Sequence, residues 1–79
     1  MTVDRQWHEP VYLQVAGILR DRIASGELAP GRPVPSLRTL VETYGINRGT
    51  AAKALRVLAD EGLVTAVKGR GWFVTPAAG

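Results

Sequence analysis

The stretch INRGTAAKALRVLADEGLV, residues 46–64, has the length and the end signals of one amphipathic helix. Asn47 is a favourable helix N-cap, and Gly62 is a common residue just past a helix end. Apolar residues recur between them at a period of 3.6, namely Ala51, Ala54, Leu55 and Leu58. The pattern predicts a helix over 47–61 that buries one face in a core.

The first turn of this helix, Arg48-Gly49-Thr50, is poorly suited to packing or to helix stability. It presents a long cationic donor, a position without a side chain and a hydroxyl group. Arginine can bind guanine through two hydrogen bonds or clamp a phosphate, and threonine can bind phosphate or touch a thymine methyl. Taken alone, the turn also fits an ordinary solvated helix start, so the neighbouring elements have to decide.

The N-terminal part of the chain predicts one more helix and a rigid connector. Residues 10–25 have apolar positions at helical spacing and end at Ser25-Gly26. The connector 27–35 contains three prolines, so it cannot be helical. We expect at most one very short strand there, near 33–35.

A short amphipathic helix is predicted over residues 36–43, with Ser36 as its N-cap. Gly45 then fits a left-handed helix stop, and the helix at 47–61 begins two residues later. Two helices joined by a short turn that contains glycine are typical of a helix-turn-helix.

A β-hairpin is predicted after the last helix. Residues 63–67 and 72–75 have strand composition, and the four-residue loop 68–71 between them carries two cations and two glycines. We assign Tyr44 and Phe73 to the core. Trp72 is expected to cover the edge of the core, with an interface to a second copy as the alternative.

The order helix, helix-turn-helix, hairpin predicts an α+β fold of the winged helix-turn-helix type. The domain is expected to span residues 10–75, preceded by an N-terminal arm at 1–9 and followed by a flexible tail at 76–79. A chain of 79 residues has room for one such domain.

The charge is distributed unevenly along the chain. The net charge is +3, and residues 1–26 hold three cations and three anions, so the whole excess lies after residue 26. Such an asymmetry favours a surface that faces a polyanion such as nucleic acid.

Catalytic and metal-binding functions lack their residues. There is no cysteine and one histidine, His8, and the two serines lie at helix ends. We therefore expect no enzyme activity, no cofactor and no metal site. The sequence shows no signal peptide and no membrane-length apolar run, so we expect a cytoplasmic protein that joins the nucleoid when bound to DNA.

In a helix-turn-helix the second helix enters the major groove with its N-terminal residues toward the bases, which assigns this role to 47–61. Arg38 would then clamp a phosphate, whereas Lys53 and Arg56 fit a phosphate contact and a solvated face equally well. The loop Lys68-Gly69-Arg70-Gly71 can approach the minor groove, because glycine permits the approach and arginine suits a narrow, negative groove.

The sequence also resembles the N-terminal winged helix domain of GntR-type bacterial transcription regulators over residues 10–75. The motifs that carry the resemblance are SGELAPG (25–31), PS-x-R-x-L (35–40), Y-G-I-N-R-x-T (44–50), AL-x-x-L-x-x-EGLV (54–64) and KGRGWFV (68–74). The resemblance implies sequence-specific binding of double-stranded operator DNA, usually by a dimer on a palindromic site. It implies DNA contacts from Arg38, Arg48, Thr50 and the wing residues 68–70.

We expect the complete DNA-binding set to be Ser36, Arg38, Asn47, Arg48, Gly49, Thr50, Lys53, Lys68, Gly69 and Arg70. The chain departs from the family pattern at Ala52, where an arginine is frequent, and at Leu37 and Thr39, where glutamates are frequent. These departures concern the operator sequence and the affinity rather than the fold.

Family members usually continue into an effector-binding and dimerising domain, and this chain stops at the wing. We therefore expect no small-molecule site here, and a monomer or weak homodimer. The alternative function is a winged helix adaptor that uses its basic face to bind an acidic protein. The helix start at Arg48 and Thr50 together with a glycine-containing wing favours DNA over that adaptor.

Overall fold

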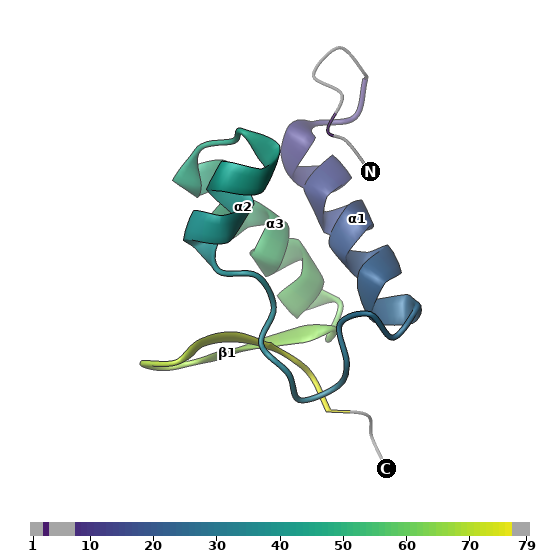
Figure 1. Ribbon diagram of the computed structural model, residues 1–79. Helices are drawn as coiled ribbons and strands as arrows, with labels where there is room; N and C mark the ends of the chain where they lie inside the picture. The colour runs from purple at the N-terminus through teal and green to yellow at the C-terminus, as the bar shows by residue number, and fades with distance from the viewer. Residues whose placement is uncertain (1–2, 4–7, 77–79) are drawn as a thin grey trace.

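Three helices are followed by a two-stranded antiparallel hairpin in the computed structural model, which describes residue 3 and residues 8–76 (Figure 1). The elements are α1 (Val11–Ala24), α2 (Leu37–Tyr44), α3 (Arg48–Asp60), β1 (Val64–Val67) and β2 (Gly71–Val74). The predicted winged helix-turn-helix is confirmed. Most of the predicted N-terminal arm, Trp7 included, and residues 77–79 of the predicted tail lie outside the described residues.

The helix-turn-helix follows from local capping chemistry. The Ser36 hydroxyl accepts a hydrogen bond from the Thr39 N–H at 3.1 Å, and the Asn47 side chain accepts one from the Thr50 N–H at 2.8 Å. Both caps satisfy backbone donors that the first helical turn leaves free. Gly45 ends α2 at φ +62°, a conformation that glycine adopts without steric cost.

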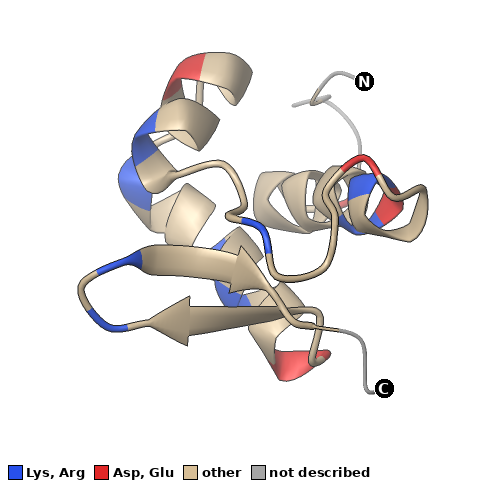
Figure 2. Cartoon of the chain, turned by 60° about the horizontal axis from the view of Figure 1, so that its bottom comes forward, with Lys and Arg blue, Asp and Glu red and all other residues tan. Residues whose placement is uncertain are grey.

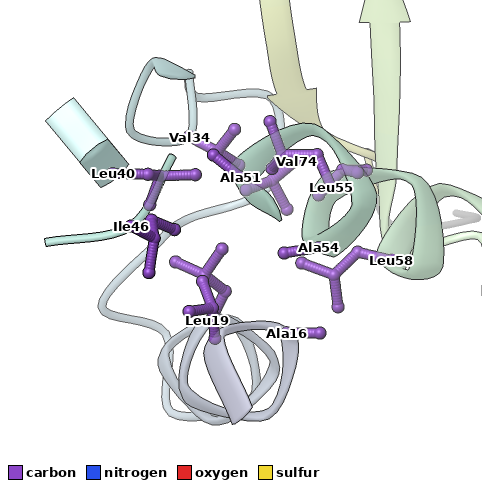
Figure 3. Packing of buried hydrophobic residues seen from close by; sticks show 12 residues of the cluster. Ala16, Leu19, Val34, Leu40, Ile46, Ala51, Ala54, Leu55, Leu58 and Val74 are labelled. Carbon is purple, nitrogen blue, oxygen red and sulfur yellow. The ribbon is translucent and has the colours of Figure 1, made fainter. Parts of the chain in front are cut away.

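Helix α3 supplies the centre of the core. Its residues Ala51, Ala54, Leu55 and Leu58 are fully buried. Figure 3 shows them between Leu19 of α1, Leu40 of α2 and Val74 of β2. Each fully buried leucine contributes roughly 1.5–3 kcal/mol relative to an exposed one. Helices α1 and α2 and strand β1 pack against α3, and its opposite face remains in solvent.

The hairpin turn is one residue shorter than predicted. Val67 pairs with Gly71, so the turn consists of Lys68, Gly69 and Arg70, and β2 spans 71–74 rather than 72–75. The Arg70 N–H donates to the Val67 carbonyl at 2.9 Å, and Gly69 has φ +78°, as the third position of a type II turn requires. Gly71 joins the strand although its composition indicated a loop.

The connector runs along β2 and is fixed to it. The Val34 N–H donates to the Trp72 carbonyl at 3.0 Å, and the Val74 N–H donates to the Arg32 carbonyl at 2.8 Å. The short strand expected near 33–35 reduces to a single bridge between Pro33 and Phe73. Proline has no N–H, so the two prolines of this segment cannot extend the ladder.

The two faces of β2 differ from expectation at one position. Val74 is buried and Trp72 packs against the core, whereas Phe73 is only half-buried and does not join the core cluster. The prediction of Phe73 as a core residue is wrong because successive strand residues point to opposite faces.

No helix in the described part of the chain is long and apolar enough to cross a membrane.

Candidate nucleic-acid interface

An open hollow of about 410 Å³ lies between α2, α3 and the hairpin. Four of the predicted site residues line it: Ser36 and Arg38 near the start of α2, Arg48 at the start of α3, and Arg70 in the hairpin turn. The other lining residues are Pro33, Val34, Leu37, Gly71 and Trp72. Three arginines from three separate elements thus meet at one hollow whose lining contains no acidic residue.

Ion pairs divide the cations of the molecule into two groups. Arg20 pairs with Glu61 at 2.6 Å, Arg22 pairs with Glu27, and Arg38 pairs with Glu42 at 2.9 Å. The other cations within the described ranges form no ion pair; they are Arg32, Arg48, Lys53, Arg56, Lys68 and Arg70. In Figure 2 the blue segments at the hairpin tip lie far from the C-terminus, and no red segment lies beside them.

The pair between Arg38 and Glu42 is too weak to hold Arg38 away from a phosphate. The two side chains are 86% and 65% exposed and lie four residues apart on α2. Exposed pairs of this kind contribute about 0.3–0.5 kcal/mol, and the order arginine before glutamate is the less favourable one. A phosphate oxygen can therefore replace the carboxylate.

Ser36 and Asn47 act first as helix caps. The Asn47 amide oxygen holds the Thr50 N–H, and the Ser36 hydroxyl lies 3.0 Å from that of Thr39 in addition to its capping bond. These bonds orient the first turns of α2 and α3, which carry Arg38 and Arg48. Ser36 and Asn47 therefore affect ligand binding mainly by positioning Arg38 and Arg48.

The exposed face of α3 extends the basic surface beyond the hollow. Gly49 is exposed, so the backbone beside Arg48 is accessible, and Thr50 is half-buried. The Lys53 ammonium lies 5.6 Å from the centre of the Tyr12 ring of α1, within the range of a cation–π contact. Arg56 follows one turn later and is exposed.

The residues of the hairpin turn lie in two different surroundings. Lys68 and Gly69 are exposed at the turn and do not line the hollow, whereas Arg70 does. The site predicted as one loop therefore has two parts, a projecting tip and an arginine beside the hollow.

Residues 11–74 match the family described as bacterial regulatory proteins, gntR family. The chain belongs to this family. Relatives include the transcriptional repressor NagR of Bacillus subtilis, which is 43% identical over 75 residues, or 95% of this chain and 31% of NagR. The repressor MngR of Escherichia coli, of a mannosyl-D-glycerate transport and metabolism system, is 37% identical over 67 residues, or 85% of this chain and 28% of MngR. The chain thus spans about three tenths of the length of these curated relatives.

Solved structures of gntR-family proteins share the fold. YtrA from Sulfolobus acidocaldarius, a GntR-family transcription factor, superimposes with a TM-score of 0.89 and 36% identity over 99% of this chain and 66% of YtrA. The DNA-binding domain of AraR in complex with operator ORE1 superimposes with a TM-score of 0.83 and 30% identity, over 91% of this chain and 88% of that domain.

Two residues of this gntR-family domain, Trp72 and Arg32, were not among the residues predicted to bind DNA. Trp72 lines the hollow, and Arg32 is an exposed cation without an ion pair among the described residues. Strand alternation carried the signal for Trp72, because residues 72 and 74 share a face and Val74 is buried. Arg56, which was weighed as a phosphate contact or a solvated cation, is exposed and forms no ion pair within the described part of the chain, and its role stays a prediction.

The far end of α3 is fixed to α1 by charge. Arg20 donates two hydrogen bonds, at 2.8 and 2.6 Å, to the two carboxylate oxygens of Glu61. These bonds hold the pKa of Glu61 below its ordinary value, because they stabilise the ionised carboxylate. The acidic end of α3 is thereby paired on the side of α1, away from the hollow.

Proposed function

We propose that this domain binds double-stranded operator DNA sequence-specifically, as part of a bacterial transcription repressor. The main support is that Arg38, Arg48 and Arg70 all line one open hollow that has no acidic lining residue. The repressors NagR and MngR are relatives, and the AraR domain of the same fold is described in complex with an operator. The function is that of a regulator rather than an enzyme.

In the proposed complex α3 lies in the major groove with its first turn toward the bases. Arg48 binds guanine through two hydrogen bonds, and the Thr50 hydroxyl contacts phosphate or a thymine methyl. Gly49 has no side chain, so the groove floor can come close to α3. Asn47 keeps this turn in place through its cap.

The remaining contacts are made to the backbone and the minor groove. Arg38, beside its cap Ser36, and Lys53 bind phosphates. Lys68 and Gly69 approach the minor groove at the tip, and Arg70 adds positive charge next to it. Each phosphate neutralised releases counterions, so affinity will fall steeply with salt.

The partner is operator DNA in the cytoplasm, where a palindromic site would place one copy of the domain on each half. A weak homodimer on such a site needs no effector pocket and no cofactor within this domain. The half-sites would lie about one helical turn apart on one face of the duplex.

The test is selection of bound duplexes from a random pool, followed by affinity measurements with Arg48→Ala. We expect Arg48→Ala to lose discrimination at one base position by roughly 1–3 kcal/mol, because one bidentate base contact is removed. Arg22→Ala, which removes a paired arginine elsewhere, should leave discrimination unchanged. Failure of the unaltered domain to bind any duplex at low salt would refute the proposal and leave an acidic protein as the partner of the basic face.

A further inference from the structure

The hollow has a composition that a base-reading surface does not require. Arginines occupy its rim, whereas Val34, Leu37 and Trp72 supply apolar surface. A DNA strand alternates in the same way, because each charged phosphate is followed by a largely apolar deoxyribose. We propose that the hollow receives the sugar–phosphate backbone of one strand, with Arg70 on a phosphate and Trp72 on the adjoining deoxyribose.

This inference rests on the proposed function and refines it at two residues. It directs Arg70 to the backbone rather than into the minor groove, and it adds Trp72 as a contact. Lys68 and Gly69 remain as the minor-groove tip.

The geometry of the duplex brings a strand to this place. The major and minor grooves are separated by one sugar–phosphate strand, so a domain with α3 in one groove and the hairpin tip in the next must straddle that strand. The hollow lies between these two elements. In Figure 1 the hairpin and α2 extend to the same side of the molecule, with α2 above and the hairpin below.

The wall that carries Trp72 is fixed before any ligand binds. The Trp72 carbonyl accepts a hydrogen bond from the Val34 N–H at 3.0 Å, and on the other side Trp72 pairs with Ala66 of β1. Its side chain is half-buried and packs against the core while also lining the hollow. Little conformational entropy is lost when such a preorganised ring makes a contact.

The neighbouring residue provides a matched control. Phe73 is an aromatic residue of the same strand and is half-buried like Trp72, but it does not line the hollow. A substitution there changes an aromatic residue of the same strand without touching the proposed contact.

The first experiment uses Trp72 as its own reporter. The chain has two tryptophans, so a Trp7→Phe background leaves Trp72 alone. A duplex of about 20 base pairs, or two turns of B-DNA, selected from a random pool by the unaltered domain is titrated into it. We expect the Trp72 emission to change and to saturate with the binding curve.

The affinities of Trp72 and Phe73 variants for the same duplex test whether the Trp72 ring itself contributes to binding. Trp72→Phe should bind within about twofold of the unaltered domain, and Trp72→Leu about threefold to tenfold more weakly, since most of the apolar contact is lost. Phe73→Leu should bind as the unaltered domain does. Thermal melting of each variant verifies that it is folded at the assay temperature.

The second experiment tests Arg70 with duplexes that each carry one uncharged methylphosphonate. At one phosphate, neutralisation should weaken the unaltered domain about tenfold but weaken Arg70→Ala much less, because the partner is already gone. Purely additive losses at every phosphate, together with unchanged Trp72 emission and full affinity of Trp72→Leu, would overturn the inference while DNA binding stands. No binding of any duplex by the unaltered domain would overturn the proposed function and this inference with it.

Discussion

The arginines of α1 and those around the hollow are the same residue type in opposite surroundings. Arg20 and Arg22 are each paired with a glutamate, whereas Arg48 and Arg70 have no acidic partner among the described residues. The hollow therefore carries positive charge that no acidic residue of its lining neutralises. A difference in pairing, rather than in the number of cations, distinguishes a binding surface from a solvated one.

The strongest test of this comparison removes the same charge from each side. The double variant Arg48→Ala/Arg70→Ala should lose DNA affinity by at least about 150-fold, because hydrogen bonds to charged groups contribute roughly 1.5–3 kcal/mol each. Arg20→Ala/Arg22→Ala has the same net charge and should lose less than about threefold, mostly through long-range attraction. Fluorescence anisotropy with a labelled duplex measures both. Equal losses would mean that overall charge, not its position, governs binding.

The salt dependence of DNA affinity should also distinguish the two double variants, Arg48→Ala/Arg70→Ala at the hollow (the hollow variant) and Arg20→Ala/Arg22→Ala on α1 (the α1 variant). We expect the magnitude of the slope of log affinity against log salt to fall by about 1 for each phosphate contact removed, and hence by about 1 for Arg48→Ala/Arg70→Ala, in which Arg70 is the residue on a phosphate. The slope of the α1 variant should match that of the unaltered domain. Titrations at several salt concentrations give the slopes, and parallel lines for all three proteins would argue against phosphate contacts in the hollow.

Arg38 lies between the two groups, since it is paired but highly exposed. Glu42→Gln should raise DNA affinity about twofold to threefold at low salt, because a competing carboxylate of small pairing energy is removed. Glu27→Gln, which frees Arg22 instead, should have little effect. The same anisotropy assay at low salt decides the matter, and lower affinity of Glu42→Gln would show that this glutamate orients Arg38 productively.

The smallest expected effect concerns the pair on the side of α1. Arg20 lowers the pKa of Glu61, so the pair stabilises the folded state fully above the ordinary glutamate value of 4.5. That stabilisation is lost as the pH falls through the lower folded-state pKa. The melting temperature of Glu61→Gln should therefore lie below that of the unaltered domain at neutral pH and approach it in acid. Circular dichroism melts from about pH 6 to about pH 3 test this, and a constant gap would exclude ionisation of Glu61 as the cause.

The helical part of the domain was predictable because its signals are local. Ser36, Asn47 and Gly45 act through hydrogen bonds or dihedral angles within a few residues, and the helix boundaries fall within about two residues of those expected. The family motifs gave the same architecture, and the comparisons confirm it.

The hairpin was predicted less accurately, because its details depend on pairing with another segment. The assignment of Gly71 to the loop was wrong, since its place in the strand follows from its pairing with Val67. Phe73 was wrongly assigned to the core, since the buried face of β2 is fixed by which residues meet α3. The amino-acid composition of a strand does not by itself fix its pairing register or its buried face.

By itself the sequence determined the order of the elements, their caps and the family, since these depend on neighbouring residues and on motif spacing. It also supplied the cations. Only the tertiary structure decided that Arg20 pairs with Glu61 and which cations meet at the hollow, because Arg20 and Glu61 are 41 positions apart and three elements bring Arg38, Arg48 and Arg70 together. Electrostatic interactions depend on distance in space, and folding sets that distance.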